Sequence, residues 1–195
     1  MLSVLLRDYA ARHPIEVLSR LEPPEALPQG VTWQTLTAVE MEATWSAARV
    51  EKQVDEALCR RVPLPGGGSL IIDEREALTT IDVNSGSTVT AADGETLAVE
   101  ENLRAAAEAA RQIRLRNLSG ILLIDFIDMH SDMDRARVIA AMEEAAADDR
   151  VKTVIHGFTS LGLLEMTRKR TRDTLCDTLT QPCDACHATG RVRRD

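Results

Sequence analysis

The chain lacks the features that would place it in a membrane or send it out of the cell. No apolar run approaches the roughly 20 residues that a membrane-spanning helix needs. Residues 1–6 (Met-Leu-Ser-Val-Leu-Leu) are too short for the apolar region of a signal peptide, and no basic start precedes them. We therefore expect a cytoplasmic protein without a membrane span.

Cysteine and aromatic residues are both scarce. Four cysteines in 195 residues are expected to be thiols or metal ligands in the cytoplasm, not a disulfide framework. Aromatic residues make up only 3% of the chain, so its apolar residues are mainly Ala, Leu, Ile and Val. The length allows one domain with a sizeable core and a small appendage.

Positive charge is in deficit, since the formal net charge is −8. Such a charge argues against a generic nucleic-acid coat, because non-specific affinity comes mainly from cationic contacts with phosphates. Basic residues are nevertheless grouped, and each group taken alone is most simply a solvated helix face or tail. The groups are Arg111, Arg114 and Arg116; Arg168, Lys169, Arg170 and Arg172; and Arg191, Arg193 and Arg194.

Two apolar segments end in acidic residues. Residues 121–124 are all aliphatic and lead directly into Asp125, which is typical of a strand buried on both faces. An upstream segment, residues 77–83, carries Asp82 and is followed by Asn84. Strands that bring these three residues to one sheet edge would form an all-oxygen site for a hard cation such as Mg²⁺. The alternative is that they are ordinary turn residues at strand ends.

A long helix is expected between these segments, from an N-cap at Asp93 to about residue 117. Apolar residues recur along it at intervals of three and four, which predicts one narrow buried face. The resulting strand–helix–strand crossover is long enough to make the two strands parallel neighbours, with both acids at the same C-terminal edge. The buried positions are Val99, Leu103, Ala106, Ala110 and Ile113.

The remaining pattern predicts an α/β fold with a mixed sheet and flanking helices. We expect an amphipathic helix over residues 3–21, a linker over 22–30, and helices over 35–47 and 50–59. An extended segment should lead into a glycine turn at 66–68, followed by a hairpin of residues 69–72 and 78–83. A helix over 131–147, a strand over 151–158 and a helix over 161–172 complete the prediction. The predicted domains are residues 1–49, 50–172 and 173–195.

The C-terminal tail carries a Cys-x-x-Cys pair, Cys183 and Cys186. This spacing places two thiolates on one tetrahedral Zn²⁺ and supplies half of its ligands. A site within one chain would add Cys176 and His187, although the adjacent Cys186 and His187 would strain to reach one ion. A redox pair would need a strand–helix setting, which the tail does not suggest.

Several motifs occur in an order that resembles the catalytic half of the ribonuclease E/G family. They are Gly-Gly-Ser-Leu-Ile-Ile-Asp at 67–73, Glu-Ala-Leu-Thr-Thr-Ile-Asp-Val-Asn-Ser-Gly at 76–86, Glu-Asn-Leu-Arg-Ala-Ala-Ala at 101–107, Ala-Arg-Gln-Ile-Arg-Leu-Arg at 110–116, Ile-Asp-Phe-Ile-Asp-Met at 124–129, Gly-Leu-Leu-Glu-Met-Thr-Arg at 162–168 and the Cys-x-x-Cys pair. The resemblance covers about residues 50–190. It implies a DNase I-like subdomain followed by a zinc link.

The resemblance also implies the chemistry. Asp82 and Asp125 match the carboxylates that hold a catalytic Mg²⁺, and Asn84 matches an amide that helps to orient the site. The implied activity is that of an endoribonuclease of RNA processing and decay, which cleaves single-stranded RNA to leave a 5′-phosphate and a 3′-hydroxyl. Cys183 and Cys186 match a pair that shares one structural Zn²⁺ with a second protomer, which implies a homodimer.

Arginines near the site are the expected RNA contacts, namely Arg111, Arg114, Arg168 and Arg170. Asp128 is the runner-up metal ligand, but its offset of three from Asp125 puts it on the opposite strand face, so we expect a structural role or an N-cap. His130 and His156 are candidates for acid–base chemistry near the motifs, although we expect structural or surface roles for them. The alternative function is that of a weakly active or inactive relative, which binds RNA or a protein partner. The retained acids favour the nuclease, whereas the alternative is supported by Ser87 and Ser160, which stand where the family has basic residues. No oligonucleotide-binding barrel or 5′-end sensor is recognised either, and residues 1–49 retain at most an RNase H-like remnant.

Overall fold

The computed structural model describes residues 14–86, 94–186 and 190. The chain divides into two compact units, of which the first ends at Asp55 and the second begins at Glu56. Helix α3 (Val50–Leu58) begins in the first unit and ends in the second. Among the described helices, none has the length and apolarity that crossing a membrane requires.

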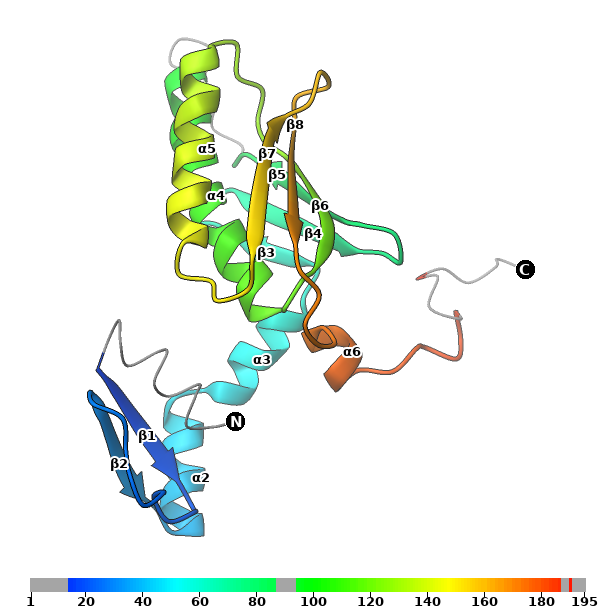
Figure 1. Ribbon diagram of the computed structural model, residues 1–195. Coiled ribbons are helices and arrows are strands. Elements are labelled where there is room, and N and C mark those ends of the chain that lie inside the picture. The colour runs from blue at the N-terminus through cyan, green and yellow to red at the C-terminus, as the bar shows by residue number, and fades with distance from the viewer. Residues whose placement is uncertain (1–13, 87–93, 187–189, 191–195) are drawn as a thin grey trace. The chain divides into compact units, whose positions relative to one another are not determined.

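The first unit contains a small parallel sheet and a helix (Figure 1). Strands β1 (Ile15–Ser19) and β2 (Val31–Thr35) pair in parallel, and α2 (Ala38–Ala47) follows. A capping box between Thr37 and Glu40 fixes the start of α2. The helices predicted over 35–47 and 50–59 are confirmed. The helix predicted over 3–21 is wrong at β1, where burial alternates with the period of a strand, and residues 1–13 lie outside the described part.

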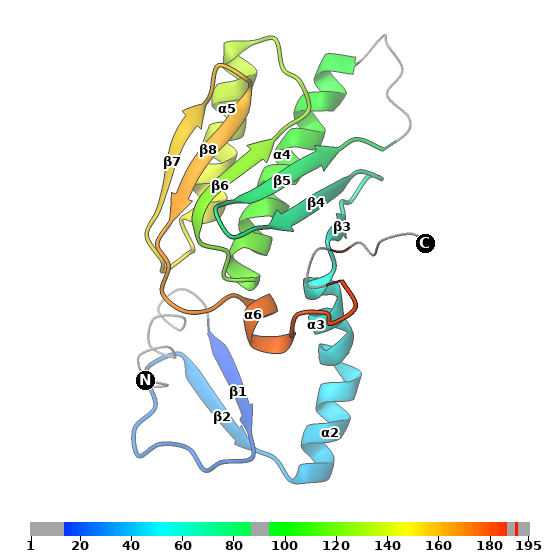
Figure 2. The ribbon, with the colours of Figure 1, turned by 90° about the vertical axis from the view of Figure 1, so that its right-hand side faces the viewer.

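A six-stranded mixed sheet forms the second unit (Figures 1 and 2). Its strand order is β3-β4-β5-β6-β8-β7, and only β5 and β6 are parallel neighbours. The predicted α/β fold with a mixed sheet is therefore confirmed. The strands are β3 (Arg61–Pro63), β4 (Ser69–Glu74), β5 (Thr79–Asn84), β6 (Gly120–Asp125), β7 (Thr153–Phe158) and β8 (Leu163–Arg168).

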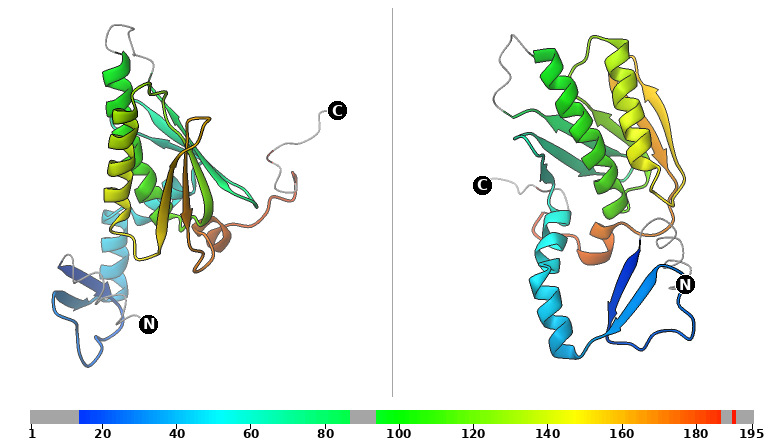
Figure 3. Two further views of the ribbon diagram at one scale, coloured as in Figure 1. Left: turned by 45° about the horizontal axis from the view of Figure 1, so that its top comes forward. Right: turned by 90° about the vertical axis from the view of Figure 1, so that its left-hand side faces the viewer.

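Two helices cover one face of this sheet (Figure 3). They are α4 (Gly94–Leu115), which connects β5 to β6, and α5 (Asp132–Ala146), which begins after an N-cap at Ser131. A short helix, α6 (Leu175–Leu179), follows β8. The crossover helix and the helix over 131–147 were both predicted, whereas the Asp93 cap lies outside the described residues.

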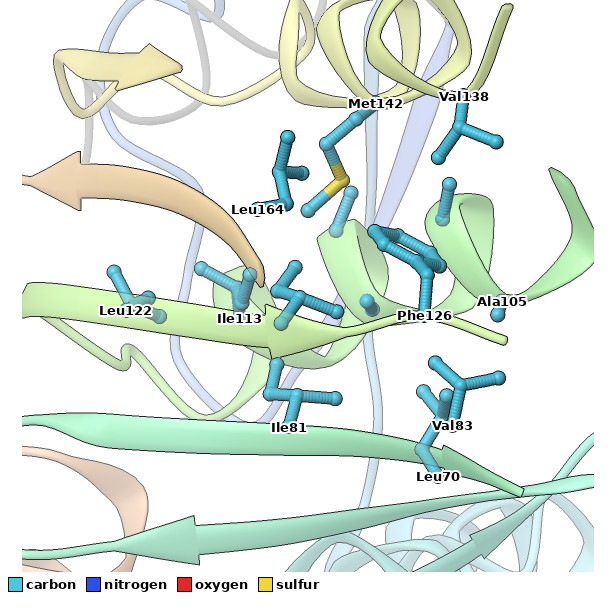
Figure 4. Close-up of a cluster of buried hydrophobic side chains, with 14 of the residues drawn as sticks. Leu70, Ile81, Val83, Ala105, Ile113, Leu122, Phe126, Val138, Met142 and Leu164 are labelled. Carbon is cyan, nitrogen blue, oxygen red and sulfur yellow. The ribbon is translucent and has the colours of Figure 1, made fainter. Parts of the chain in front are cut away.

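The core lies between the sheet and these helices (Figure 4). Ile81 and Val83 of β5 point into it, whereas the intervening residues face away. Ala105, Ala106 and Ala109 on α4 are fully buried, and their small size lets the helix approach the sheet closely. Other buried members are Leu70, Ile113, Leu122, Phe126, Val138, Met142 and Leu164.

The helix predicted over 161–172 is wrong, because residues 163–168 form strand β8, which pairs antiparallel with β6 and β7. A short apolar run such as Leu163-Leu164 fits a helix and a strand equally well by periodicity. The deciding signal is alternation, since Leu164, Met166 and Arg168 are all buried. Gly162, with a φ of 84°, supplies the left-handed turn before the strand.

Candidate metal centre and cysteine pair

Parallel pairing of β5 and β6 brings two acids together. Asp82 and Asp125 are direct partners in the strand register, and adjacent strands lie about 4.8 Å apart. The buried neighbours Ile81 and Val83 leave Asp82 on the opposite, open face of the sheet. In the described part of the second unit, no helix covers that face (Figure 2). The sequence prediction that both acids lie at one sheet edge is confirmed.

Asn84 joins this pair from the same strand face. Its side-chain Nδ2 donates a hydrogen bond of 2.7 Å to Oδ2 of Asp82. Residues two apart on a strand share a face, so the Asp-x-Asn spacing produces this contact directly. The amide thus orients the Asp82 carboxylate beside Asp125.

The surroundings of Asp125 disfavour its negative charge. Burial raises the pKa of Asp125 above its ordinary value, and the charges of Asp82 and Asp128 raise it further. Carboxylates in such proximity are stabilised by a cation between them. The expectation that Asp128 lies on the opposite strand face fails, because β6 ends at Asp125 and alternation does not extend to Asp128.

The oxygen donors fit a sparsely liganded Mg²⁺. This ion is usually held by one or two carboxylates and keeps several waters, which leaves room for a phosphate oxygen. Within residues 14–86, 94–186 and 190, no group of three or more His, Cys, Asp or Glu side chains is arranged to hold a metal. Two carboxylates and one amide are a donor set that suits an open, hydrated ion.

Asn102 supports the segment that follows Asp125, and the sequence analysis did not identify it. This α4 side chain is fully buried. Its Nδ2 donates to the Ile127 carbonyl at 2.8 Å, and its Oδ1 accepts from the Ile127 N–H at 2.9 Å. The available signal was its position between Val99 and Ala106 on the apolar stripe, since a polar residue there must find buried partners.

Arg168, one of the four predicted RNA contacts, has an internal position. Its Nε and Nη2 bind the Asp149 carboxylate at 2.6 and 3.3 Å. Its Nη1 donates to Asn117 Oδ1 and to the Leu118 carbonyl, both at 2.9 Å. The side chain is only 2% exposed, so this arginine holds the fold together and does not reach a phosphate in solvent.

The other three predicted RNA contacts differ in their surroundings. Arg111 is half-exposed and pairs with Glu108 at 2.7 Å. Arg114 is half-buried, and its charge helps to lower the pKa of Asp149. Arg170 is exposed. Their contact with RNA stays a prediction.

The predicted zinc pair has a thiolate-stabilising environment at Cys183. Hydrogen bonds from the backbone N–H groups of Cys186 and Ala185, and then from the Cys186 side chain, lower the pKa of the Cys183 thiol. Zinc binds thiolates, so a lowered pKa favours metal binding near neutral pH. Cys176 lies on α6, with its sulfur 3.4 Å from the Thr180 hydroxyl. The alternative ligand His187 lies outside the described residues.

The two histidines near the motifs occupy surface positions. His156 on β7 is exposed, and its Nε2 lies 3.1 Å from the Thr167 hydroxyl on β8. His130 is exposed as well. Neither position contradicts the expectation of a structural or surface role.

Comparison with known proteins identifies a common family. The model of the ribonuclease E/G family matches residues 28–171. Ribonuclease G of Escherichia coli (strain K12) is 47% identical over 144 residues, which are 74% of this chain and 29% of that protein. Ribonuclease E of Synechocystis is 42% identical over 144 residues, which are 74% of this chain and 21% of that protein.

A chloroplastic ribonuclease E/G-like protein of Arabidopsis thaliana is 41% identical over 145 residues, or 73% of this chain and 14% of that protein. The chain thus spans less than a third of the length of these relatives. The matched region contains the acidic pair, Asn84 and Asn102, and ends before the cysteine pair. On this evidence, the chain belongs to the ribonuclease E/G family.

Proposed function

We propose that this chain is the Mg²⁺-dependent catalytic part of an endoribonuclease that hydrolyses phosphodiester bonds of single-stranded RNA. The observation that carries the proposal is the pairing of Asp82 with Asp125, with Asn84 bound to the first carboxylate. The names of the relatives support it, because each of them is a ribonuclease E, G or E/G-like protein. We also propose that the sheet and its helices form a DNase I-like subdomain.

The carboxylates of Asp82 and Asp125 would hold the cation on the open sheet face. When bound, Mg²⁺ lowers the pKa of a coordinated water and stabilises charge on the phosphate oxygens. Asn84 orients Asp82, and Asn102 fixes the backbone beyond Asp125. Hydrolysis would add water to phosphorus and break the bond to the 3′-oxygen, leaving a 5′-phosphate and a 3′-hydroxyl.

We further propose that the cysteine pair of each of two chains completes one four-thiolate zinc site. The N–H donors around Cys183 support this assignment, because they stabilise its thiolate. Two chains related by a two-fold axis would present the same patch to each other. The tail that carries the pair, residues 173–195, is then an assembly element attached to the catalytic region of residues 50–172.

The alternative is a relative without significant catalysis that binds RNA or a protein partner. Its support is that Arg168, a predicted RNA contact, is internal, and that Ser160 stands where the family has a basic residue. A fluorescent single-stranded RNA, incubated with the chain and Mg²⁺ with and without a chelator, separates the two functions. Chelator-sensitive cleavage supports the nuclease, and binding without cleavage supports the alternative.

A further inference from the structure

Two adjacent residues of α4, Glu101 and Asn102, each contact a segment beside one of the acid-bearing strands. Asn102 binds the backbone just after β6, and Glu101 packs on the glycine turn that lies against the end of β5. Both side chains are buried, although each has strongly polar atoms. A buried polar group on an otherwise apolar helix face usually has a specific partner. Asn102 finds one in the Ile127 backbone and Glu101 Oε2 finds one in Arg104, whereas Glu101 Oε1 has no hydrogen-bond partner among the described residues.

On the β6 side, the Asn102 side chain supplies backbone hydrogen bonds beyond the point where the pairing of β6 with β8 ends. The ladder with β8 stops at Asp125, which pairs with Leu163. Two residues later, the Asn102 amide binds both the N–H and the carbonyl of Ile127. Backbone groups that would otherwise be unsatisfied are therefore held by one side chain. This contact fixes the path of the chain between Asp125 and Asp128.

On the β5 side, Glu101 contacts the glycine turn, and the turn packs closely against the backbone of Asn84. A Cβ atom at Gly68 would lie 1.9 Å from Glu101 Oε1 and 2.8 Å from the Asn84 carbonyl oxygen. A Cβ at Gly86 would lie 2.9 Å from the carbonyl carbon and oxygen of Gly67. The glycine turn is thus packed between Glu101 and the segment that follows Asp82. Because no side chain fits at Gly68, this packing depends on glycine there.

Arg104 holds the Glu101 side chain in place. Its Nη1 donates to Glu101 Oε2 at 3.1 Å, and its Nη2 donates to Glu100 Oε2 at 3.2 Å. The Glu101 carboxylate is therefore restrained on the helix surface while its other oxygen faces the turn. The contact with Ile127 and the contact with the glycine turn are thus made by consecutive residues of one helix.

We propose that Asn102 and Glu101 are positioning residues that set the separation of Asp82 and Asp125, and thereby the affinity of this pair for a divalent cation. The inference rests on the proposed function, because it assigns a use to the same two carboxylates. Neither residue is assigned contact with RNA or metal. Their effect is exerted through Ile127 on one side and through Gly68 and Asn84 on the other.

Asn117 offers a matched control at the other end of the helix. It is also a buried asparagine, and its Nδ2 donates to the carbonyls of Arg172 and Asp173 at 3.1 and 3.0 Å. It lies next to Leu118, before β6 begins, so it is separated from Asp125 by the length of that strand. Asn117→Ala removes these two hydrogen bonds and the one that Asn117 Oδ1 accepts from Arg168, and it places alanine at a left-handed φ of 53°. It is therefore a severe control for general destabilisation, and it does not touch either strand end that carries an acid.

The test measures Mn²⁺ binding by calorimetry for the parent chain, Asn102→Ala, Gly68→Ala and Asn117→Ala, together with amide hydrogen exchange at Ile127. We expect Asn102→Ala and Gly68→Ala to weaken Mn²⁺ binding at least about tenfold, which corresponds to about 1.4 kcal/mol. Exchange at Ile127 should accelerate in Asn102→Ala alone. Asn117→Ala should bind Mn²⁺ like the parent chain.

Three outcomes count against the account, and they differ in what they overturn. Parent-like Mn²⁺ affinity in both Asn102→Ala and Gly68→Ala, with faster exchange at Ile127, overturns the positioning role alone. An equal loss of affinity in Asn117→Ala also overturns it, because the effect is then general destabilisation. A parent chain that neither binds Mn²⁺ nor cleaves RNA overturns the proposed function and the inference together. If Asn102→Ala does not fold, Gly68→Ala carries the test.

Discussion

Arg168→Met is expected to lower the free energy of unfolding of the second unit by about 3–5 kcal/mol. The Arg168 side chain is 2% exposed, and the side chain of its partner Asp149 is 9% exposed. Methionine approximates the length of the arginine stem and removes every donor. The Asp149 carboxylate then stays buried without its counter-charge, and breaking one partner of a buried pair costs more than the pair contributes.

The size of the effect follows from the number of acceptors that lose their donor. Besides both oxygens of Asp149, the Asn117 side chain and the Leu118 carbonyl each lose a hydrogen bond from Arg168. An unsatisfied buried acceptor costs about 1–3 kcal/mol, although such costs are not additive. Domains are typically stable by about 5–15 kcal/mol, so this loss is a large fraction of the total.

Urea unfolding followed by circular dichroism measures the change, with Arg111→Met as the matched control. Arg111 also pairs with a carboxylate, Glu108, but its side chain is 54% exposed. An exposed pair contributes about 1 kcal/mol or less, so the control should unfold almost like the parent. A loss below about 1 kcal/mol for Arg168→Met, equal to that of the control, would refute the structural role of Arg168.

Three other perturbations have defined outcomes. Burial alone would raise the pKa of Asp149, but hydrogen bonds from Arg168 and the Val151 N–H, together with the charges of Arg168 and Arg114, hold it below its ordinary value. The stability that Asp149 contributes is therefore complete above about pH 4 and is lost as the pH falls through the lowered pKa. Acid unfolding of the Asp149→Asn variant should show no such loss. Leu164→Ala should cost about 2–5 kcal/mol in thermal or urea unfolding, because Leu164 is fully buried in the core, and a cost below 1 kcal/mol would contradict its place there. Cys183→Ser should abolish zinc-dependent dimerisation in light scattering with metal analysis, with Cys59→Ser as the control; one zinc per monomer in the parent chain would contradict the shared site.

The parallel core of the fold was predictable from sequence because its signals are local and strong. The aliphatic run before Asp125 and the narrow apolar stripe of α4 each match one periodicity well. A crossover of this length then makes β5 and β6 parallel neighbours, which aligns Asp82 with Asp125. The acidic pair could therefore be predicted before any coordinates were known.

Strands β1 and β8 and the role of Arg168 could not be predicted in the same way. Five or six residues contain too few repeats to separate a strand from a helix, and pairing with distant strands decides the outcome. Arg168 belongs to a basic cluster in the sequence, yet Asp149 and Asn117, which bind it, are 19 and 51 residues away. Only the tertiary structure shows that it is internal and that its neighbours Lys169 and Arg170 are exposed.

We propose that Asp82 and Asp125 together hold the cation that RNA cleavage requires. The most direct measurement is the initial rate of cleavage of a fluorescent single-stranded RNA in Mg²⁺ by the parent chain, Asp82→Asn, Asp125→Asn and the exposed control Asp132→Asn. We predict a loss of about a hundredfold or more for the first two variants, a parent-like rate for Asp132→Asn, and no cleavage by any of them with a chelator. A parent chain that cleaves, together with either Asp82→Asn or Asp125→Asn at the parent rate, would contradict the assignment.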